Sequence, residues 1–132
     1  MNANVKAYMD KLGSLELVET DTWTVTETLS AIYVAGALDS CADELFRILE
    51  RHPLEDNHAT DEISGMLELV PGYENKLLES LNREVSFAAV RMLKSLINSG
   101  QTHIGDIDMN HLLASITNNP MVNSAIRRTA GY

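Results

Sequence analysis

Large apolar residues recur along the chain at helical spacing, and one short pattern of them occurs three times. The pattern is a polar residue, two large apolar residues, two variable positions and a further apolar residue. It reads ELFRIL at 44–49, KLLESL at 76–81 and HLLASI at 111–116, so the copies begin 32 and then 35 residues apart. A period of about 30 to 40 residues is typical of stacked helix pairs, because one pair cannot bury its apolar face alone.

The same spacing, with breakers and caps at the segment ends, predicts about eight helices. Gly13 and Pro53 end two of them, and Ser86 caps a third. Asn119 followed by Pro120 predicts the start of the last helix, as a cap and a first helical position. The expected helices cover residues 5–12, 24–38, 41–52, 60–70, 73–82 and 86–98, a segment beginning at 108, and 120–129.

Two further helix starts have their own signals. Thr24-Val25-Thr26-Glu27 fits a capping box, in which the side chains of the first and fourth residues each accept a backbone bond. Asp39-Ser40 fits the cap of the following helix. Residues 14–23 stay open between loop, helix and strand, because 22–26 alternates like a strand but has no second strand-like segment to pair with.

These elements predict an all-α fold of stacked antiparallel helix pairs, a short helical solenoid in one domain over 1–132. A chain of 132 residues, 45% of them hydrophobic, can form one core, and with few aromatic residues that core consists mainly of Leu, Ile, Val, Met and Ala. Helices over 1–38 precede three degenerate helix pairs within 40–129, at 40–70, 73–98 and 107–129.

Composition favours a soluble, cytoplasmic protein. Cys41 is the one cysteine, which excludes an internal disulfide and fits a reducing compartment. The first dozen residues carry charges and no apolar run, so we expect no signal peptide. No stretch reaches the roughly 20 apolar residues that a membrane span needs.

Charge is distributed unevenly along the chain, whose net charge is −9. Residues 16–75 carry fourteen acids and two bases, whereas residues 76–132 carry six bases and four acids. An acidic block of this kind repels nucleic acid. It can also raise the encounter rate with a basic partner, although acids on a surface also serve solubility alone.

One surface patch follows from this block as a candidate site for binding a basic protein partner. Its acids are expected around one helix, its exit turn and the start of the next helix. Asp43 and Arg47 stand four residues apart and are expected to form a local ion pair. The patch consists of Asp43, Glu44, Glu50, Glu55, Asp56, Asp61 and Glu62.

Motifs for catalysis or cofactor binding are missing from the sequence. It has no Gly-rich phosphate loop, no G-x-S-x-G and no H-E-x-x-H. Two His/Asp clusters, at 52–62 and 103–111, lie in polar connections without a known ligand spacing, which favours solvated turns over a metal site. We expect Cys41 to be a small, partly buried residue, and Arg127-Arg128 to interact with a helix C-terminus. No catalytic, cofactor-binding or metal-binding residues are predicted.

The helix pairs resemble HEAT repeats. Residues 86–93 (SFAAVRML), with alanines and an arginine opening a second helix, carry the resemblance best. A small, acidic, all-helical chain is also similar to the immunity proteins of bacterial polymorphic-toxin and contact-dependent growth inhibition systems, some of which have HEAT-like folds. That similarity implies a protein that binds one cognate toxin domain, often a basic nuclease, and blocks its active site or substrate groove.

An immunity protein of this kind is therefore the expected function, without enzyme activity, cofactor or nucleic-acid partner. A generic helical-repeat adaptor, with a housekeeping or regulatory partner and no toxin, is the main alternative. An enzyme or metal protein that uses one of the His/Asp clusters is the third.

Overall fold

Residues 3–14 and 22–131 are described by a computed structural model of the chain. Within these ranges the chain forms eight helices and one short hairpin. The elements are α1 (Ala3–Ser14), α2 (Thr22–Val34), α3 (Leu38–Arg51), α4 (His58–Leu67), α5 (Tyr73–Arg83), α6 (Phe87–Asn98), β1 (His103–Ile104), β2 (Ile107–Asp108), α7 (Met109–Thr117) and α8 (Ser124–Gly131).

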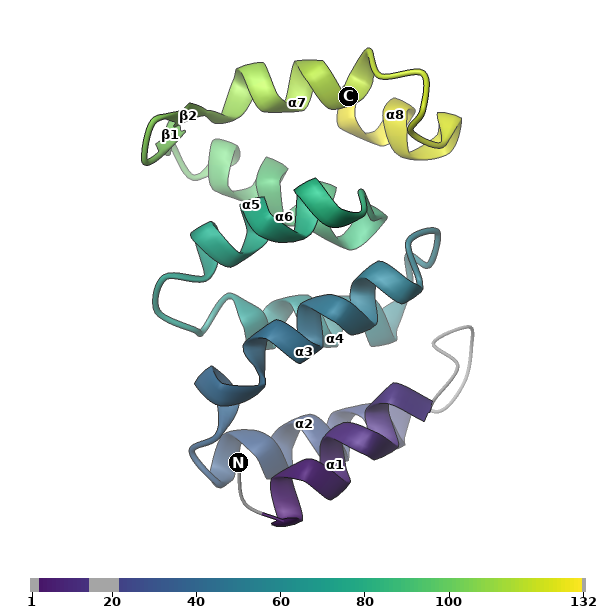
Figure 1. The fold of residues 1–132 in the computed structure, drawn as a ribbon, viewed down its shortest axis with the longest axis vertical. Helices are drawn as coiled ribbons and strands as arrows, with labels where there is room; N and C mark the ends of the chain where they lie inside the picture. Colours follow the sequence, from purple (N-terminus) through teal and green to yellow (C-terminus); the bar gives the residue numbers. More distant parts are fainter. Residues whose placement is uncertain (1–2, 15–21, 132) are drawn as a thin grey trace.

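Successive helices form antiparallel pairs that follow one another along the long axis of the molecule (Figure 1). The stack has two layers, because α3 packs on both α1 and α5, while α4 packs on both α2 and α6. The expected pairs at 40–70, 73–98 and 107–129 correspond to α3–α4, α5–α6 and α7–α8, and α1–α2 precedes them. The prediction of an all-α fold with packed helices is confirmed.

The repeated apolar pattern lies on the inward faces of α3, α5 and α7, and its burial decreases along the stack. Leu45, Phe46 and Leu49 are fully buried in α3. The corresponding apolar positions of α7 include Leu112 and Leu113, which are only half-buried. Because α3 has neighbours in both directions, it forms the centre of the core, and α7 lies at its margin.

The expected helix over 24–38 is wrong at both ends. The chain turns after Val34 at Gly36, which has a φ of +68°, in the left-handed region that favours glycine. Asp39 and Ser40 therefore lie in the first turn of α3 instead of capping it, and the N-cap, Ala37, forms no side-chain bond. Of the open segment 14–23, residues 15–21 lie outside the described residues.

α2 begins at Thr22, so the capping box expected at Thr24-Val25-Thr26-Glu27 lies within the helix and not at its start. Thr24 and Glu27 are the first and last residues of that pattern. A capping residue requires an extended backbone ahead of the helix, and Thr24 is already helical.

The connection expected over 99–107 contains a two-stranded antiparallel hairpin, β1–β2, which the sequence analysis did not predict. Its turn includes Gly105 with a φ of +58°. Two residues per strand are too few to show an alternating pattern, so no sequence signal stood out. Asp108, where the helix carrying the third copy of the pattern was expected to begin, is the N-cap of α7, and its carboxylate accepts the backbone N–H of His111 at 3.1 Å.

The last helix begins at Ser124 and not at Pro120. Asn119 does accept a backbone N–H, from Met121 at 2.9 Å, but this bond closes a turn. Asn123 accepts the backbone N–H of Ala125 at 2.9 Å and so stands at the true helix start. An Asn side chain that accepts the backbone N–H two residues ahead is found both in turns and at helix caps. This explains why the sequence predicted the start of the last helix too early.

Replacing Asn57 by Ala is expected to lower the free energy of unfolding by about 1 kcal/mol, because it removes the capping box of α4. Asn57 accepts the backbone N–H of Thr60 at 3.1 Å, and the Thr60 hydroxyl accepts the backbone N–H of Asn57 at 3.0 Å. Urea denaturation measures the loss. Asn57→Ser keeps a side-chain acceptor without placing a second carboxylate beside Glu55, and it should remain close to wild type. Equal losses in both variants would contradict a capping role.

Candidate functional site

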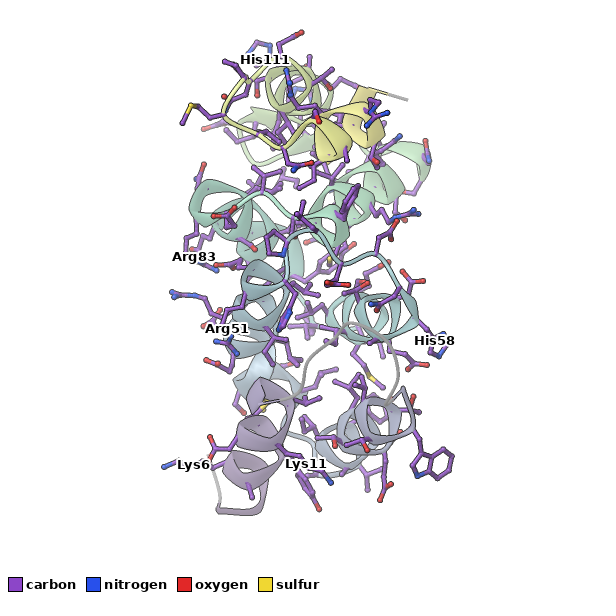
Figure 2. All side chains as sticks on the ribbon, turned by 90° about the vertical axis from the view of Figure 1, so that its right-hand side faces the viewer. Lys6, Lys11, Arg51, His58, Arg83 and His111 are labelled. Atoms are coloured by element: carbon purple, nitrogen blue, oxygen red, sulfur yellow. The ribbon has the colours of Figure 1, made fainter. Side chains whose placement is uncertain are left out.

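The seven acids of the expected patch lie on two different layers of the stack. Asp43, Glu44 and Glu50 belong to α3, whereas Asp61 and Glu62 belong to α4. Glu55 and Asp56 lie in the turn between these helices. Figure 2 shows the consequence: Arg51 of α3 and Arg83 of α5 extend from one side of the molecule, and His58 of α4 from the other. The acids of α3 and those of α4 therefore belong to different layers of the stack.

Three of the seven acids bind bases of the next helix pair. The carboxylate of Asp43 lies 2.8 Å from the Lys76 ammonium. That of Glu50 lies 2.8 Å from the Arg83 guanidinium, and that of Asp56 lies 2.7 Å from Arg91. Each pair joins residues 33 or 35 positions apart, close to the spacing of the repeated pattern. The acidic and basic halves of the sequence thus meet where the pairs stack, which stabilises the fold and reduces the charge available to a partner.

Glu50 is the most deeply placed of these acids, with a side chain only 9% exposed. Its two oxygens accept bonds from Arg83 Nε at 2.9 Å, Arg83 Nη2 at 2.8 Å and Ser80 Oγ at 2.7 Å. Burial by itself would raise the pKa of Glu50, but the hydrogen bonds from Arg83 and Ser80 outweigh it, and the pKa lies below the ordinary value.

Two other acids of the patch have partners within their own helix pair. Arg51 lies 3.5 Å from Glu44, and the His58 ring nitrogen lies 3.1 Å from Glu62. The expected pair between Asp43 and Arg47 does not form, because Asp43 contacts Lys76 and Arg47 approaches Glu50 at 4.0 Å instead. The pair of Glu44 with Arg51 and that of Glu62 with His58 are at least partly exposed to solvent and contribute little to stability.

Glu55 and Asp61 are the acids of the patch whose carboxylates have the fewest contacts with other polar side chains among the described residues. Glu55 accepts one long bond, from the Asn57 amide at 3.4 Å. The carboxylate of Asp61 is exposed and forms no hydrogen bond or ion pair within the described part of the chain, although its charge adds to that of Asp56 on Arg91. Asp61 is therefore the position of the patch most available to an external cation.

Asp61 lines a shallow groove of about 300 Å³ on α4, which we call the α4 groove. Gly65 leaves its middle open, because a Cβ there would have no neighbour within 4 Å. Leu69, at its end, is 59% exposed, and Met66 is half-buried. The groove is lined by His58, Asp61, Glu62, Gly65, Met66 and Leu69, so it combines two carboxylates with an apolar floor.

Sequence reasoning did not identify Gly65 and Leu69 as parts of a site. It assigned Met66 to the inward face of its helix, whereas the side chain contacts the core and also borders the groove. The available signal for Leu69 was its position within the helix expected over 60–70, where this large apolar residue falls outside the apolar stripe.

The two His/Asp clusters do not assemble a metal site. Among the described residues, no group of three or more His, Cys, Asp or Glu side chains is placed to hold a metal ion. In the second cluster, the Asp108 carboxylate caps α7 and lies 3.9 Å from the His103 ring. The backbone N–H of His111 holds the pKa of Asp108 below its ordinary value. The bond that caps α7 therefore explains the position of the Asp108 carboxylate.

Cys41 is fully buried in α3, more completely than expected. Burial raises the pKa of its thiol, which disfavours the reactive thiolate. A nucleophilic role for Cys41 therefore has no support in its surroundings.

None of the described helices has the length and apolar character needed to cross a bilayer. Searches with family models, among curated proteins and among solved structures returned no match to this chain. The fold class is that of an all-α protein of stacked helix pairs, and function has to be inferred from its surfaces.

Proposed function

We propose that this protein is a binding module that holds a basic protein partner at the α4 groove. It acts as an immunity protein: the partner is a toxin domain, and binding occludes the active site or substrate groove of that toxin. The observation that carries the proposal is the exposed Asp61 carboxylate, without an ion-pair partner in the described residues, beside the exposed Leu69.

The chemistry of the α4 groove supports a partner residue that is both cationic and long. A Lys or Arg side chain can lay its methylene stem on Met66 and Leu69 while its charged end reaches Asp61. Arginine is common at the energetic centres of protein interfaces for this reason. Asp61 and Met66 are held by α4 and Leu69 by the turn that follows it, so little backbone entropy is lost on binding.

A stable interface extends beyond one groove, since specific complexes bury about 1,200 to 2,000 Å² in total. α2 packs beside α4 and exposes Trp23 (75%) and Val34 (84%). Tryptophan is among the residues most enriched at interface centres. A partner seated on α4 can therefore continue onto α2.

Replacing Asp61 by Lys is expected to weaken binding of the basic partner about tenfold, because repulsion replaces attraction at the groove. The partner is first isolated by retention on the tagged wild-type protein from lysate of the source organism, and its Kd for each variant is then measured by calorimetry. Asp106→Lys is the matched control: Asp106 is also exposed, and no ion pair involves it among the described residues. Unchanged affinity in Asp61→Lys would exclude the α4 groove.

Activity of the isolated partner separates the immunity function from the adaptor alternative. A toxin loses its enzymatic activity when it is mixed with equimolar wild-type protein and keeps more of it with Asp61→Lys at limiting concentration. An adaptor's partner keeps its own activity in both mixtures, and that result would overturn the immunity proposal while leaving the binding site intact.

A further inference from the structure

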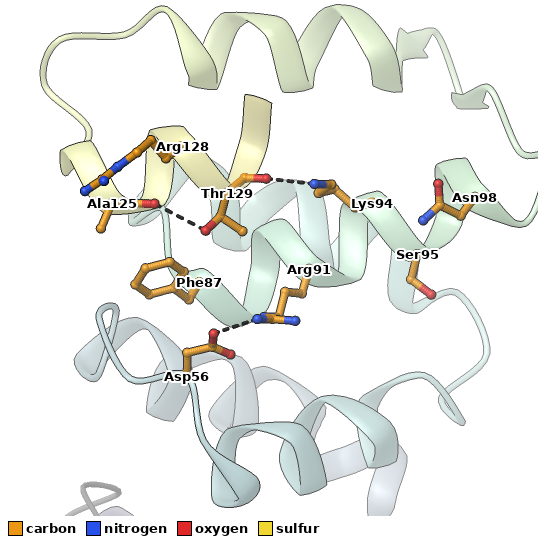
Figure 3. A pocket seen from close by; sticks show the side chains of 9 residues that line it. All are labelled: Asp56, Phe87, Arg91, Lys94, Ser95, Asn98, Ala125, Arg128 and Thr129. Atoms are coloured by element: carbon orange, nitrogen blue, oxygen red, sulfur yellow. Dashed lines mark hydrogen bonds and ion pairs between the residues drawn. The ribbon is translucent and has the colours of Figure 1, made fainter. Parts of the chain in front are cut away.

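A wide hollow of the described surface lies between α6 and α8, in the half of the chain that carries more bases than acids. It measures about 800 Å³ and is open to solvent. Figure 3 shows it from close by. We call it the basic groove; its lining is Asp56, Phe87, Arg91, Lys94, Ser95, Asn98, Ala125, Arg128 and Thr129.

Three positive side chains and one negative side chain line this groove, in a protein whose net charge is −9. Arg91 and Lys94 extend from α6, and Arg128 extends from the last turn of α8. Arg128 is exposed and has no ion-pair partner among the described residues. The groove therefore attracts negative charge locally, although the molecule as a whole repels it.

The position of Asp56 shows that a carboxylate can bind in the basic groove. Its carboxylate reaches in from the turn between α3 and α4 and lies 2.7 Å from a guanidinium nitrogen of Arg91. Burial is partial on both sides of this pair, since the side chains are 32% and 56% exposed. A carboxylate of the protein itself thus already occupies one of the three cationic positions.

The cationic groups are spread along the groove and do not converge on one point. Figure 3 shows Arg91 directed toward Asp56 and Lys94 directed toward α8, where its ammonium donates to the Thr129 carbonyl at 2.8 Å. α6 runs along the groove from Phe87 to Asn98. At a rise of about 1.5 Å per residue its length is about 18 Å. A compact anion such as phosphate could contact only one cation closely, whereas an extended peptide of about five residues covers this length.

We propose that the basic groove binds an acidic segment of a protein, with its carboxylates on Arg128 and Arg91 and its backbone against the polar groups of Ser95 and Asn98. Phe87 supplies an apolar contact at one end of the groove. This site is separate from the α4 groove in both residues and charge, so the molecule presents an acidic and a basic recognition surface.

The test uses the full-length protein and a fluorescein-labelled hexaglutamate peptide with blocked ends, at low ionic strength. Anisotropy is expected to rise to saturation with the wild type, and amide shifts in the NMR spectrum should be confined to α6, α8 and the turn at Asp56. Arg128→Glu and Ser95→Glu are each expected to weaken binding about tenfold, by repulsion of the peptide. Both positions are exposed, so the fold should be kept, which circular dichroism verifies.

Lys6→Glu makes the same charge change as Arg128→Glu on α1, at the other end of the stack (Figure 2), and should bind the peptide as the wild type does. Absence of binding by the wild type, or equal affinities in all variants, would overturn the proposal. It would also be overturned if a hexathymidine oligonucleotide bound as tightly, or if phosphate displaced the peptide better than chloride of equal ionic strength. Arg128→Glu should leave affinity for the basic partner unchanged, which keeps this test independent of the α4 groove.

Discussion

Replacing Glu50 by Gln is expected to lower the free energy of unfolding by about 2 kcal/mol at neutral pH, because it removes one half of a partly buried ion pair. The Glu50 side chain is 9% exposed and accepts bonds at both oxygens from Arg83 and Ser80. Glutamine offers a single acceptor oxygen and no charge. Arg83 is 32% exposed, so water compensates part of the loss and keeps it below the cost of a fully buried pair.

Urea denaturation measures this loss, and Glu44→Gln supplies the matched control in the same helix. Glu44 and Arg51 are each 48% exposed and lie 3.5 Å apart, so this substitution should cost less than about 0.5 kcal/mol. If the two variants lost equal stability, the pair between α3 and α5 would contribute no more than an exposed surface pair.

Acid should remove the advantage of the wild type over Glu50→Gln. The pKa of Glu50 is lower in the folded protein than its ordinary value, so the folded state binds this proton less readily than the unfolded state does. The stabilisation is therefore complete above the ordinary range, about pH 4.3, and is lost as the pH falls through the lowered pKa of the folded state. Urea midpoints of both proteins, measured from pH 7 down to pH 3, should converge at the acidic end.

The helices and their pairing could be predicted from the sequence because both depend on local apolar spacing. Leu45, Phe46 and Leu49 repeat the pattern that places apolar residues on one helical face, and all three are buried. The predicted ends of the helices were wrong where an apolar run and a helix-ending glycine occur together. Ala35, Ala37 and Leu38 continue the apolar character on both sides of Gly36, and the positive φ of that glycine is visible only in the structure.

The candidate site was predictable as a block of charge but not as a surface. Which acids remain available depends on bases about 33 residues away, and the sequence alone does not show that Lys76 faces Asp43 or that Arg83 faces Glu50. These contacts require the stacking of one helix pair on the next. Asp61 stays available because Arg91, the base that its charge reaches, forms its ion pair with Asp56 instead.

Replacing Phe46 by Ala is expected to cost about 4 kcal/mol, the largest stability effect of any substitution considered for this chain, because Phe46 is fully buried. Its helix, α3, packs on α1, α4 and α5, so the cavity would open where the first three helix pairs meet. Urea denaturation measures the total loss. Leu113→Ala is the matched control, since Leu113 occupies the same place in the third repeated pattern and is only half-buried. It should cost about 1 kcal/mol.

Hydrogen exchange should locate the loss within the stack. Stability in stacked repeats is approximately the sum of contributions from each unit and from each interface between neighbours. Phe46→Ala weakens the units around α3, so amides of α1 to α4 should lose protection first, while those of α6 and α8 keep more of theirs. An equal loss over all described helices would mean that the domain unfolds as one cooperative unit. A partner bound at α4 would then stabilise the whole molecule and not only the half that it contacts.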